Sequence, residues 1–180
     1  MWLISDERND AALEAALQQL PRGSGFIYRH YHLPDARRRQ RFDKLSALAR
    51  TRGHCIILSA DAATAREWGA DGIYGPPEIM AKAAGLICLA AVHDAAEIAA
   101  AGRIGADAAL LSPVFPTRSH PGAEPLGPAR FRELARLAQM PVIALGGMTP
   151  GNAQALDWPR WAAIDGLGIA FRRLAPPAQE

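Results

Sequence analysis

The sequence predicts an α/β fold in which eight short strands alternate with helices and close into a compact (β/α)₈ barrel. Three observations support this prediction. Short apolar runs recur along the whole chain, the segments between them have the composition of helices, and a Gly-Ala-Asp signal precedes two of the runs. Such an alternation favours a parallel sheet covered by helices, and eight repeats favour a closed barrel over an open sheet.

Several of the runs are continuously apolar rather than alternating, which is typical of parallel strands buried on both faces. We therefore expect strands within eight segments, in chain order: WLIS (2–5), GFIYRH (25–30), HCIILS (54–59), DGIYG (71–75), LICLAAV (86–92), DAALLSPV (107–114), PVIALGG (141–147) and IDGLGIA (164–170).

The intervening segments carry the signals that begin helices. Asp35, which follows a proline, is the expected N-cap of one helix. Asp94 and Glu97 have the spacing of a capping box, with Asp in the role of Ser or Thr. Thr149 precedes Pro150, which suits a cap followed by proline at the first helical position.

The repeated Gly-Ala-Asp stands at 69–71 and 105–107, and AIDGLGI at 163–169 is a looser copy. We expect the glycine to end a helix and the aspartate to begin the turn into a strand.

The chain is short for such a barrel, which usually has about 200 residues or more. The helices that are shorter than usual are the first and the last. The segment 9–20 allows only a short first helix, and FRRLAPPAQE after Ile169 is too short and too rich in proline for a full final helix. We expect one domain, 1–180, with a shortened or missing final helix.

Composition excludes several classes of protein. Hydrophobic residues make up 49% of the chain and charged residues 21%, an ordinary balance for a globular domain. No apolar run approaches the roughly 20 residues of a membrane helix, and MWLISDERND does not have the pattern of a signal peptide. Cys55 and Cys88 lie within apolar runs, which favours buried free thiols in a cytoplasmic protein.

Basic residues are concentrated at Arg37–Arg41, although the net charge is only +2. A solvated helix face is the simpler interpretation, since no known nucleic-acid-binding motif accompanies the cluster. We therefore do not expect nucleic acid among the partners.

In such a barrel the active site lies at the carboxyl ends of the strands. The seventh predicted strand ends there at Gly146 and Gly147, followed by a helix. Glycine lets the backbone approach a ligand closely, and free N–H groups bind phosphate. The alternative is a tight turn without a ligand.

The stretch LLSPVFPTRSHPGAEPLG (110–127) is a second candidate at this end. It supplies Thr117, Arg118, Ser119 and His120, which are donors suited to an anion, in a loop stiffened by prolines. Loops of this length are usually functional. The alternative is a stiff surface connection.

Together, LLSPVFPTRSHPGAEPLG and PVIALGGMTPGNA resemble the thiamine-phosphate synthase/TenI family. The family pattern is G-P-[IV]-F-x-T-x-[ST]-K, a glycine further on, and then P-[VI]-[VI]-A-[IL]-G-G-[IM]-T. The likeness is specific over 105–156. It is weaker over 54–104, where GADGIYG takes the place of G-A-D-G-V-H-L-G, and loose over 1–53.

The resemblance implies a TIM barrel that joins hydroxymethylpyrimidine diphosphate to a thiazole phosphate, using Mg²⁺ and releasing pyrophosphate. Gly146 and Gly147 would then hold the thiazole phosphate, while Thr117 and Ser119 would lie near the pyrophosphate and thiazole groups. The expected partners are these small phosphate esters. The incomplete final helix leaves part of the barrel for another subunit to cover, as in a homo-oligomer.

The sequence departs from the family where the diphosphate would bind. The family's Gln-x-Arg-x-Lys corresponds to IYRHYHLP, which leaves Arg29 as a phosphate contact with His32 nearby and no lysine. His120 occupies the place of a second family lysine. For the metal, Asp61 lies one residue beyond the family's carboxylate, and Glu78 would replace another, with Tyr74 in place of a histidine.

Three functions are consistent with these residues. The first, which we expect, is a divergent thiamine-phosphate synthase with substitute residues for the diphosphate and Mg²⁺, in which Ser119, His120 and His93 would serve catalysis. The second is a thiazole phosphate isomerase that uses His120 or His93 as acid and base, although Pro113 takes the place of that family's histidine. The third is a non-catalytic regulator that binds a phosphate ester.

Overall fold

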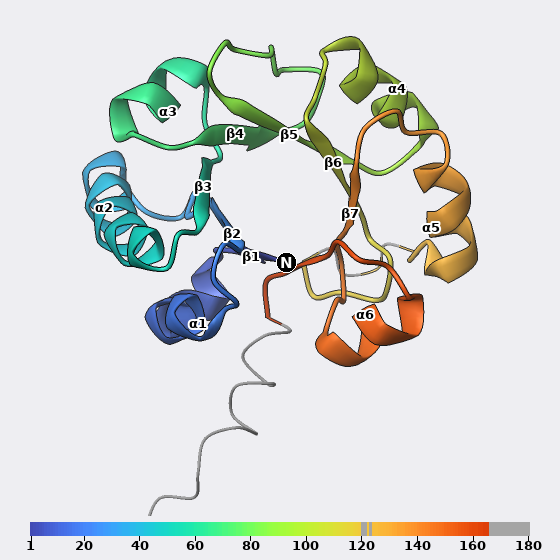
Figure 1. The fold of residues 1–180 in the computed structure, drawn as a ribbon, viewed down its shortest axis with the longest axis horizontal. Helices are drawn as coiled ribbons and strands as arrows, with labels where there is room; N and C mark the ends of the chain where they lie inside the picture. The colour runs from blue at the N-terminus through green and yellow to red at the C-terminus, as the bar shows by residue number, and fades with distance from the viewer. Residues whose placement is uncertain (120–121, 123, 166–180) are drawn as a thin grey trace, which may run out of the picture.

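The protein folds as a barrel of eight parallel strands. The computed structural model describes residues 1–119, 122 and 124–165. The strands follow the order β7-β6-β5-β4-β3-β2-β1-β8. A parallel bridge between Ala144 and Trp161 joins the two ends of this order, with Ala144 N donating to Arg160 O over 2.9 Å. Figure 1 shows the resulting ring of strands inside a ring of helices, which confirms the predicted fold class.

The elements alternate along the chain as the sequence predicts. The strands are β1 (Trp2–Ile4), β2 (Gly25–Tyr28), β3 (Cys55–Leu58), β4 (Gly72–Gly75), β5 (Ile87–Val92), β6 (Ala108–Leu111), β7 (Val142–Ala144) and β8 (Ala162–Ala163). The helices are the 3₁₀ helix η1 (Glu7–Ala12), α1 (Leu13–Gln19), α2 (Asp35–Thr51), α3 (Ala62–Trp68), α4 (Ala95–Arg103), α5 (Gly127–Ala135) and α6 (Pro150–Leu156).

Seven strands lie within their predicted segments, and the eighth does not. β8 pairs with β1 through Ala162 and Ala163, just before the predicted segment 164–170. Residues 166–170, and the segment of the shortened final helix, lie outside the described residues. Between β4 and β5 the residues 76–86 form turns and no helix.

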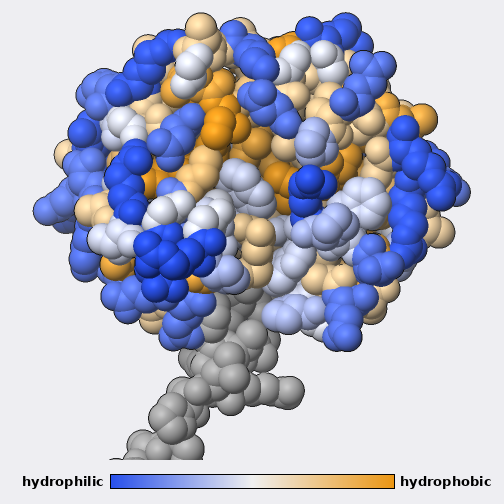
Figure 2. All heavy atoms as spheres, viewed as in Figure 1, coloured by the Kyte–Doolittle hydropathy of each residue, from blue (hydrophilic) through white to orange (hydrophobic). Residues whose placement is uncertain are grey.

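The core has two layers because successive strand residues point to opposite faces. One layer fills the barrel and the other lies between the sheet and the helices, so both faces of each strand are buried and the strands are continuously apolar. The inner layer includes Ile4, Ile27, Ile57, Leu89, Leu110 and Ile143, while the outer layer includes Leu3, Phe26, Ile56, Leu58, Leu111 and Ala144. Figure 2 shows hydrophilic residues around the periphery of the molecule, with apolar residues nearer the middle of the face.

Two of the three predicted helix starts are confirmed. Thr149 Oγ1 accepts from Asn152 N over 3.1 Å, and Asp94 accepts from Glu97 N over 2.9 Å. The Glu97 carboxylate accepts from the N–H of His93 rather than from that of Asp94. The prediction for Asp35 is wrong, because Pro34 holds the N-cap position with extended backbone and Asp35 is already helical.

The Gly-Ala-Asp repeat has a structural role on the side of the barrel where strands begin. Gly69 and Gly105 have φ values of 71° and 66°, which suit glycine at the end of a helix. The following aspartates reach the neighbouring strand: Asp71 accepts from Ile56 N over 2.7 Å, and Asp107 accepts from Cys88 N over 2.8 Å. Each carboxylate thus fixes the start of a strand pair.

The basic cluster of α2 is largely satisfied within the fold. Arg41 binds Asp10 over 2.8 Å and Glu14 over 2.6 Å, and Arg39 binds Asp43 over 2.9 Å. Arg38 lies over the ring of Trp68 at 5.4 Å. These contacts attach α2 to its neighbours.

The two cysteines are free thiols, as predicted. Cys88 is fully buried, but Cys55 is only half-buried. Burial raises the pKa of the Cys55 thiol to about 11, so it stays protonated and unreactive near neutral pH. No helix within the described residues has the length and apolar character needed to cross a membrane.

Glu14→Gln should lower stability near neutral pH by an amount that disappears in acid. The hydrogen bond from Arg41 lowers the pKa of Glu14 from 4.5 to about 2. A depressed carboxyl pKa stabilises the folded state above pH 4.5, and this contribution is lost as the pH falls from 4.5 to about 2. Urea denaturation of both proteins across this range measures the difference. A difference that stays constant down to the lowest pH would contradict the assignment.

Gly25→Ala should destabilise the barrel by about 1–3 kcal/mol through overpacking. Gly25 pairs with Trp2, and an added Cβ would lie 2.0 Å from Trp2 Cε3. The matched control is Gly151→Ala in α6, where the nearest atom would be 3.9 Å away. Chemical denaturation should show a lower midpoint for the first variant and no loss for the second.

Candidate functional site

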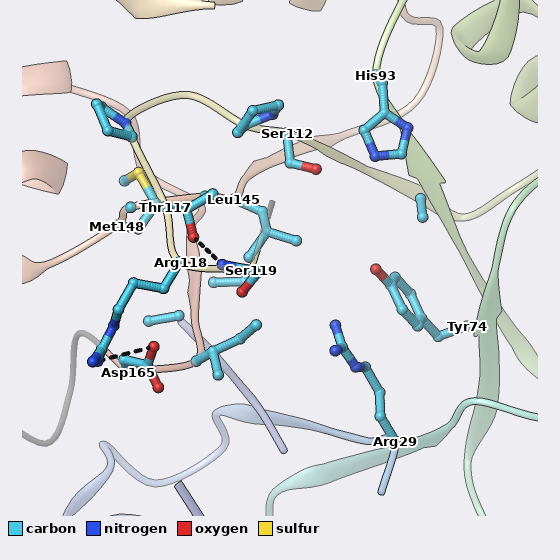
Figure 3. A pocket seen from close by; sticks show the side chains of 18 of the residues that line it. Arg29, Tyr74, His93, Ser112, Thr117, Arg118, Ser119, Leu145, Met148 and Asp165 are labelled. Carbon is cyan, nitrogen blue, oxygen red and sulfur yellow. Dashed lines mark hydrogen bonds and ion pairs between the residues drawn. The ribbon is translucent and has the colours of Figure 1, made fainter. Parts of the chain in front are cut away.

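A cavity of about 570 Å³ opens at the carboxyl ends of the strands. The loops after β2, β4, β5, β6 and β7 and the end of β8 contribute to its wall. Figure 3 shows Arg29, Tyr74 and His93 pointing into this space from one side, with Thr117 and Ser119 on the other. The seven predicted site residues that line it are Arg29, His93, Thr117, Arg118, Ser119, Gly146 and Gly147.

Gly146 and Gly147, in the turn after β7, line the cavity. The carbonyl groups of Leu145, Gly146 and Gly147 accept from Val114 N (2.9 Å), Phe115 N (3.1 Å) and Asn152 Nδ2 (2.7 Å), respectively. Within the described part of the chain, no hydrogen bond uses the N–H of Gly146 or Gly147. With its oxygens bonded elsewhere and its donors available, the turn is chemically suited to an anion.

Both glycines are required by this geometry. Gly146 and Gly147 have φ values of 90° and 62°. A Cβ on Gly146 would lie 2.6 Å from Pro113 Cα, and one on Gly147 would lie 2.5 Å from Pro116 O. The turn after β7 and the loop after β6 are therefore packed backbone to backbone, and a side chain at either position would separate them.

The loop after β6 contributes hydroxyl groups and one cation. Thr117 Oγ1 accepts from Ser119 N over 3.3 Å, which fixes the local turn. Arg118 is mostly exposed and forms an ion pair of 3.3 Å with Asp165 (Figure 3). His120 lies outside the described residues.

Arg8 connects this loop to two others. Its guanidinium donates to Ser119 Oγ over 2.8 Å, pairs with Asp6 over 2.8 Å and pairs with Asp165 over 3.3 Å. One side chain from η1 thus joins the loops after β1 and β6 and the end of β8.

The opposite wall combines a guanidinium, a phenol and an imidazole. Arg29 Nη2 pairs with Asp6 over 3.0 Å. Desolvation raises the pKa of the Tyr74 phenol to about 12, so it remains a neutral hydrogen-bond donor near pH 7. His93 Nδ1 lies 2.8 Å from Glu97 Oε2, and this carboxylate orients the ring. An oriented imidazole and a phenol in the wall of one cavity are groups suited to proton transfer.

Three predicted site residues are not brought into this cavity. His32 lines a smaller adjoining cavity of about 220 Å³, which shares Arg29 and Tyr31 with the first. Asp61 and Glu78 line neither cavity. Asp61 is the N-cap of α3, where hydrogen bonds from Thr64 N and Oγ1 lower its pKa, and Glu78 is exposed in the turn after β4.

The described residues do not fit the Mg²⁺ that the resemblance implies. Mg²⁺ is usually held by carboxylate oxygens close to the substrate phosphates. The cavity wall carries one carboxylate, Asp165, which is paired with Arg8 and Arg118. Within 1–119, 122 and 124–165, no three His, Cys, Asp or Glu side chains are grouped as metal ligands.

Asp165 is a cavity residue that sequence reasoning missed. The predicted strand 164–170 placed it at the beginning of the last strand, far from the active end. Because β8 ends at Ala163, Asp165 instead follows the strand and reaches the cavity. The sequence AIDG (163–166) is the looser copy of Gly-Ala-Asp, and in the copies at 69–71 and 105–107 the aspartate precedes a strand. Asp165 instead follows its strand, so the repeat predicted the wrong end of the barrel for it.

Comparisons with known proteins agree with this fold. The sequence model described as thiamine monophosphate synthase matches residues 1–158. The thiamine-phosphate synthase of Listeria monocytogenes is 36% identical over 125 residues, which cover 63% of this chain and 56% of that protein. The thiamine-phosphate synthase of Xanthomonas campestris is 27% identical over 166 residues, which cover 87% and 80%, respectively.

A bifunctional thiamine biosynthesis protein of Symbiobacterium thermophilum is 31% identical over 160 residues, 84% of this chain and 33% of that protein. The chain therefore spans less than two thirds of the Listeria and Symbiobacterium proteins. Among solved structures, thiamine phosphate pyrophosphorylase from Pyrococcus furiosus superposes with a TM-score of 0.74, covering 91% of this chain and 84% of the other. At 24% identity, this likeness supports the fold alone.

The family match extends over residues 1–158, well over half of the sequence. It includes all the cavity-lining residues from Arg29 to Thr149. This chain belongs to the thiamine monophosphate synthase family.

Proposed function

We propose that the protein binds a thiazole phosphate of thiamine biosynthesis, with the phosphate at Gly146 and Gly147. The observation that carries this proposal is a pair of N–H groups without a hydrogen-bond partner among the described residues, in a turn where the carbonyl groups of Leu145, Gly146 and Gly147 are bonded elsewhere. Thr117 and Ser119 line the same cavity and add hydroxyl groups. The cavity volume of about 570 Å³ is within the range of small-molecule sites.

The reaction that we propose is coupling of this thiazole phosphate to hydroxymethylpyrimidine diphosphate, as the resemblance to thiamine-phosphate synthases implies. Arg29 and Arg118 are the cations of the described wall that would face the diphosphate, and His120 is a further donor on the same loop. Guanidinium groups bind phosphate oxygens in a bidentate manner, so they can stabilise charge on a departing pyrophosphate. His32 in the adjoining cavity would extend this anion-binding wall.

Isomerisation of the thiazole phosphate is a second candidate, and the His93–Glu97 pair favours it. A carboxylate 2.8 Å from Nδ1 orients the ring, and the opposite nitrogen would then exchange a proton with the bound heterocycle. Tyr74 is a neutral donor on the same wall. This reaction needs no second substrate, which distinguishes it from coupling.

Coupling predicts thiamine phosphate as product when both substrates and Mg²⁺ are supplied. The product is detected after oxidation to its fluorescent derivative, against a heat-killed control. Gly147→Asp should abolish product because it places a bulky anion in the phosphate turn, and His120→Ala should also abolish it. Full activity in both variants would contradict the proposal. If no product forms, but thiazole phosphate binds and isomerises in the presence of a chelator, the second candidate is correct.

Gly147→Ala should weaken binding of the thiazole phosphate at least about tenfold, a loss of about 1.4 kcal/mol. The added Cβ would collide with Pro116 O at 2.5 Å and separate the turn after β7 from the loop after β6. Isothermal titration calorimetry measures the dissociation constant. Gly151→Ala, four residues away with open space, is the matched control and should bind as wild type does. Equal affinity of the two variants would place the phosphate elsewhere.

A further inference from the structure

The end of β2 contains a buried histidine whose role is not explained by the site described above. His30 stands between Arg29 and Tyr31, which both line the main cavity. Its own side chain is 1% exposed, and its φ of 45° is unusual for a residue other than glycine. A strained and buried polar residue between two cavity residues requires a specific set of contacts to hold it.

These contacts form one continuous chain of hydrogen bonds. The N–H of Arg29 donates to Ser5 Oγ over 2.8 Å. Ser5 Oγ lies 2.9 Å from His30 Nδ1, and His30 Nε2 lies 2.7 Å from Asp10 Oδ1. Arg41 donates to the same Asp10 oxygen over 2.8 Å. Every donor has an acceptor if His30 is neutral, with Ser5 donating to Nδ1 and Nε2–H donating to Asp10.

Burial supports the neutral form of this histidine. Desolvation lowers the pKa of His30, although Asp10 acts in the opposite direction. The ring also stacks on Tyr28, with centroids 4.8 Å apart and planes inclined by 23°. Ser5 is fully buried and both bonds of its hydroxyl are used, so the Ser-His-Asp arrangement is not a hydrolytic triad.

The chain fixes the backbone of Arg29 on one side, and Arg38 fixes it on the other. Arg38 Nε donates to Arg29 O over 2.7 Å. The guanidinium of Arg29 then extends into the cavity (Figure 3), where Nη2 binds Asp6. Its Nε is buried and has no hydrogen-bond partner among the described residues. Arg29 therefore combines a backbone held on both sides with a buried Nε–H donor that no described residue uses.

We propose that His30 is a positioning residue, which holds the left-handed turn after β2 and so directs the guanidinium of Arg29 at an anionic group of the ligand. The ligand part of this inference rests on the proposed function, whereas the orientation of Arg29 does not. His30 also lines the smaller adjoining cavity, but the role proposed for it is to position Arg29. Its contribution passes through the Ser5 hydroxyl and the backbone of Arg29.

The test compares His30→Asn with His54→Asn. Asn tolerates the left-handed backbone, so the first variant removes the ring while keeping the turn accessible. His54 is the matched control because it is also buried, at 3% exposed, and its Nε2 lies 2.9 Å from Leu17 O, away from both cavities. Ser5→Ala interrupts the same chain with a smaller change and serves if His30→Asn does not fold.

The first measurement is nuclear magnetic resonance of the Arg29 Nε–H, assigned with Arg29→Lys. The signal should exchange slowly with water in wild type and in His54→Asn, and rapidly in His30→Asn and Ser5→Ala. Slow exchange in all folded variants would overturn the proposal, whatever the protein binds.

The second measurement is the affinity for inorganic pyrophosphate by calorimetry. His30→Asn should weaken binding about tenfold, as expected for one misdirected charged hydrogen bond, and His54→Asn should not. In Arg29→Ala, adding His30→Asn should cause no further loss, because the two residues act as one unit. If the loss of pyrophosphate affinity in the double variant equals the product of the two single losses, the proposal is overturned. Wild type that binds no thiazole phosphate, but shows the expected exchange pattern, would instead refute the proposed function alone.

Discussion

Closure of the parallel sheet is the constraint on which the other features depend. When eight parallel strands form a ring, every carboxyl end lies on one rim. Residues separated by more than a hundred positions therefore meet there, as Arg8 and Ser119 do. Closure also buries both faces of each strand, so the strands themselves are apolar and the polar chemistry is confined to the residues just beyond them. The cavity lies at this boundary.

The candidate site depends more on the direction of backbone groups than on charged side chains. In the turn after β7, three carbonyl groups are bound by the loop after β6 and by Asn152, and two N–H groups have no hydrogen-bond partner among the residues that the structure describes. Side chains at the two glycines would prevent the contact with Pro113 and Pro116 that arranges this. The cations of the site are in contrast mostly paired: Arg29 with Asp6, and Arg118 with Asp165. An anionic ligand would compete with these carboxylates for the guanidinium groups.

The sequence predicted the barrel and seven of its strands because apolar runs and helix caps are local signals. It also identified seven residues of the cavity wall, since the residue after a strand lies at the active rim. The failures have a common cause. Asp35 and Asp165 were assigned from their distance to an element boundary, and Asp61 from its distance to the family's carboxylate. A shift of one or two residues changes the role of an aspartate completely. Asp61 caps a helix, and Asp165 faces the cavity.

His30 could not have been assigned from its neighbours, because Ser5 and Asp10 reach it across the fold. The same holds for the arginines of α2, whose density resembles a binding surface in the sequence. For Arg41, only its partners in η1 and α1 show that it holds helices together.

The position of Arg8 has a consequence for how this barrel can change. Barrels of this type are often regarded as modular, with each loop free to vary on a constant scaffold. Here one guanidinium bonds to the loop after β1, the loop after β6 and the residue following β8. Substitutions in these three segments will not combine additively, and a loop grafted from a relative without its partners would leave Arg8 with unmatched neighbours. For this protein, the unit that can be exchanged is the set of three segments together with η1.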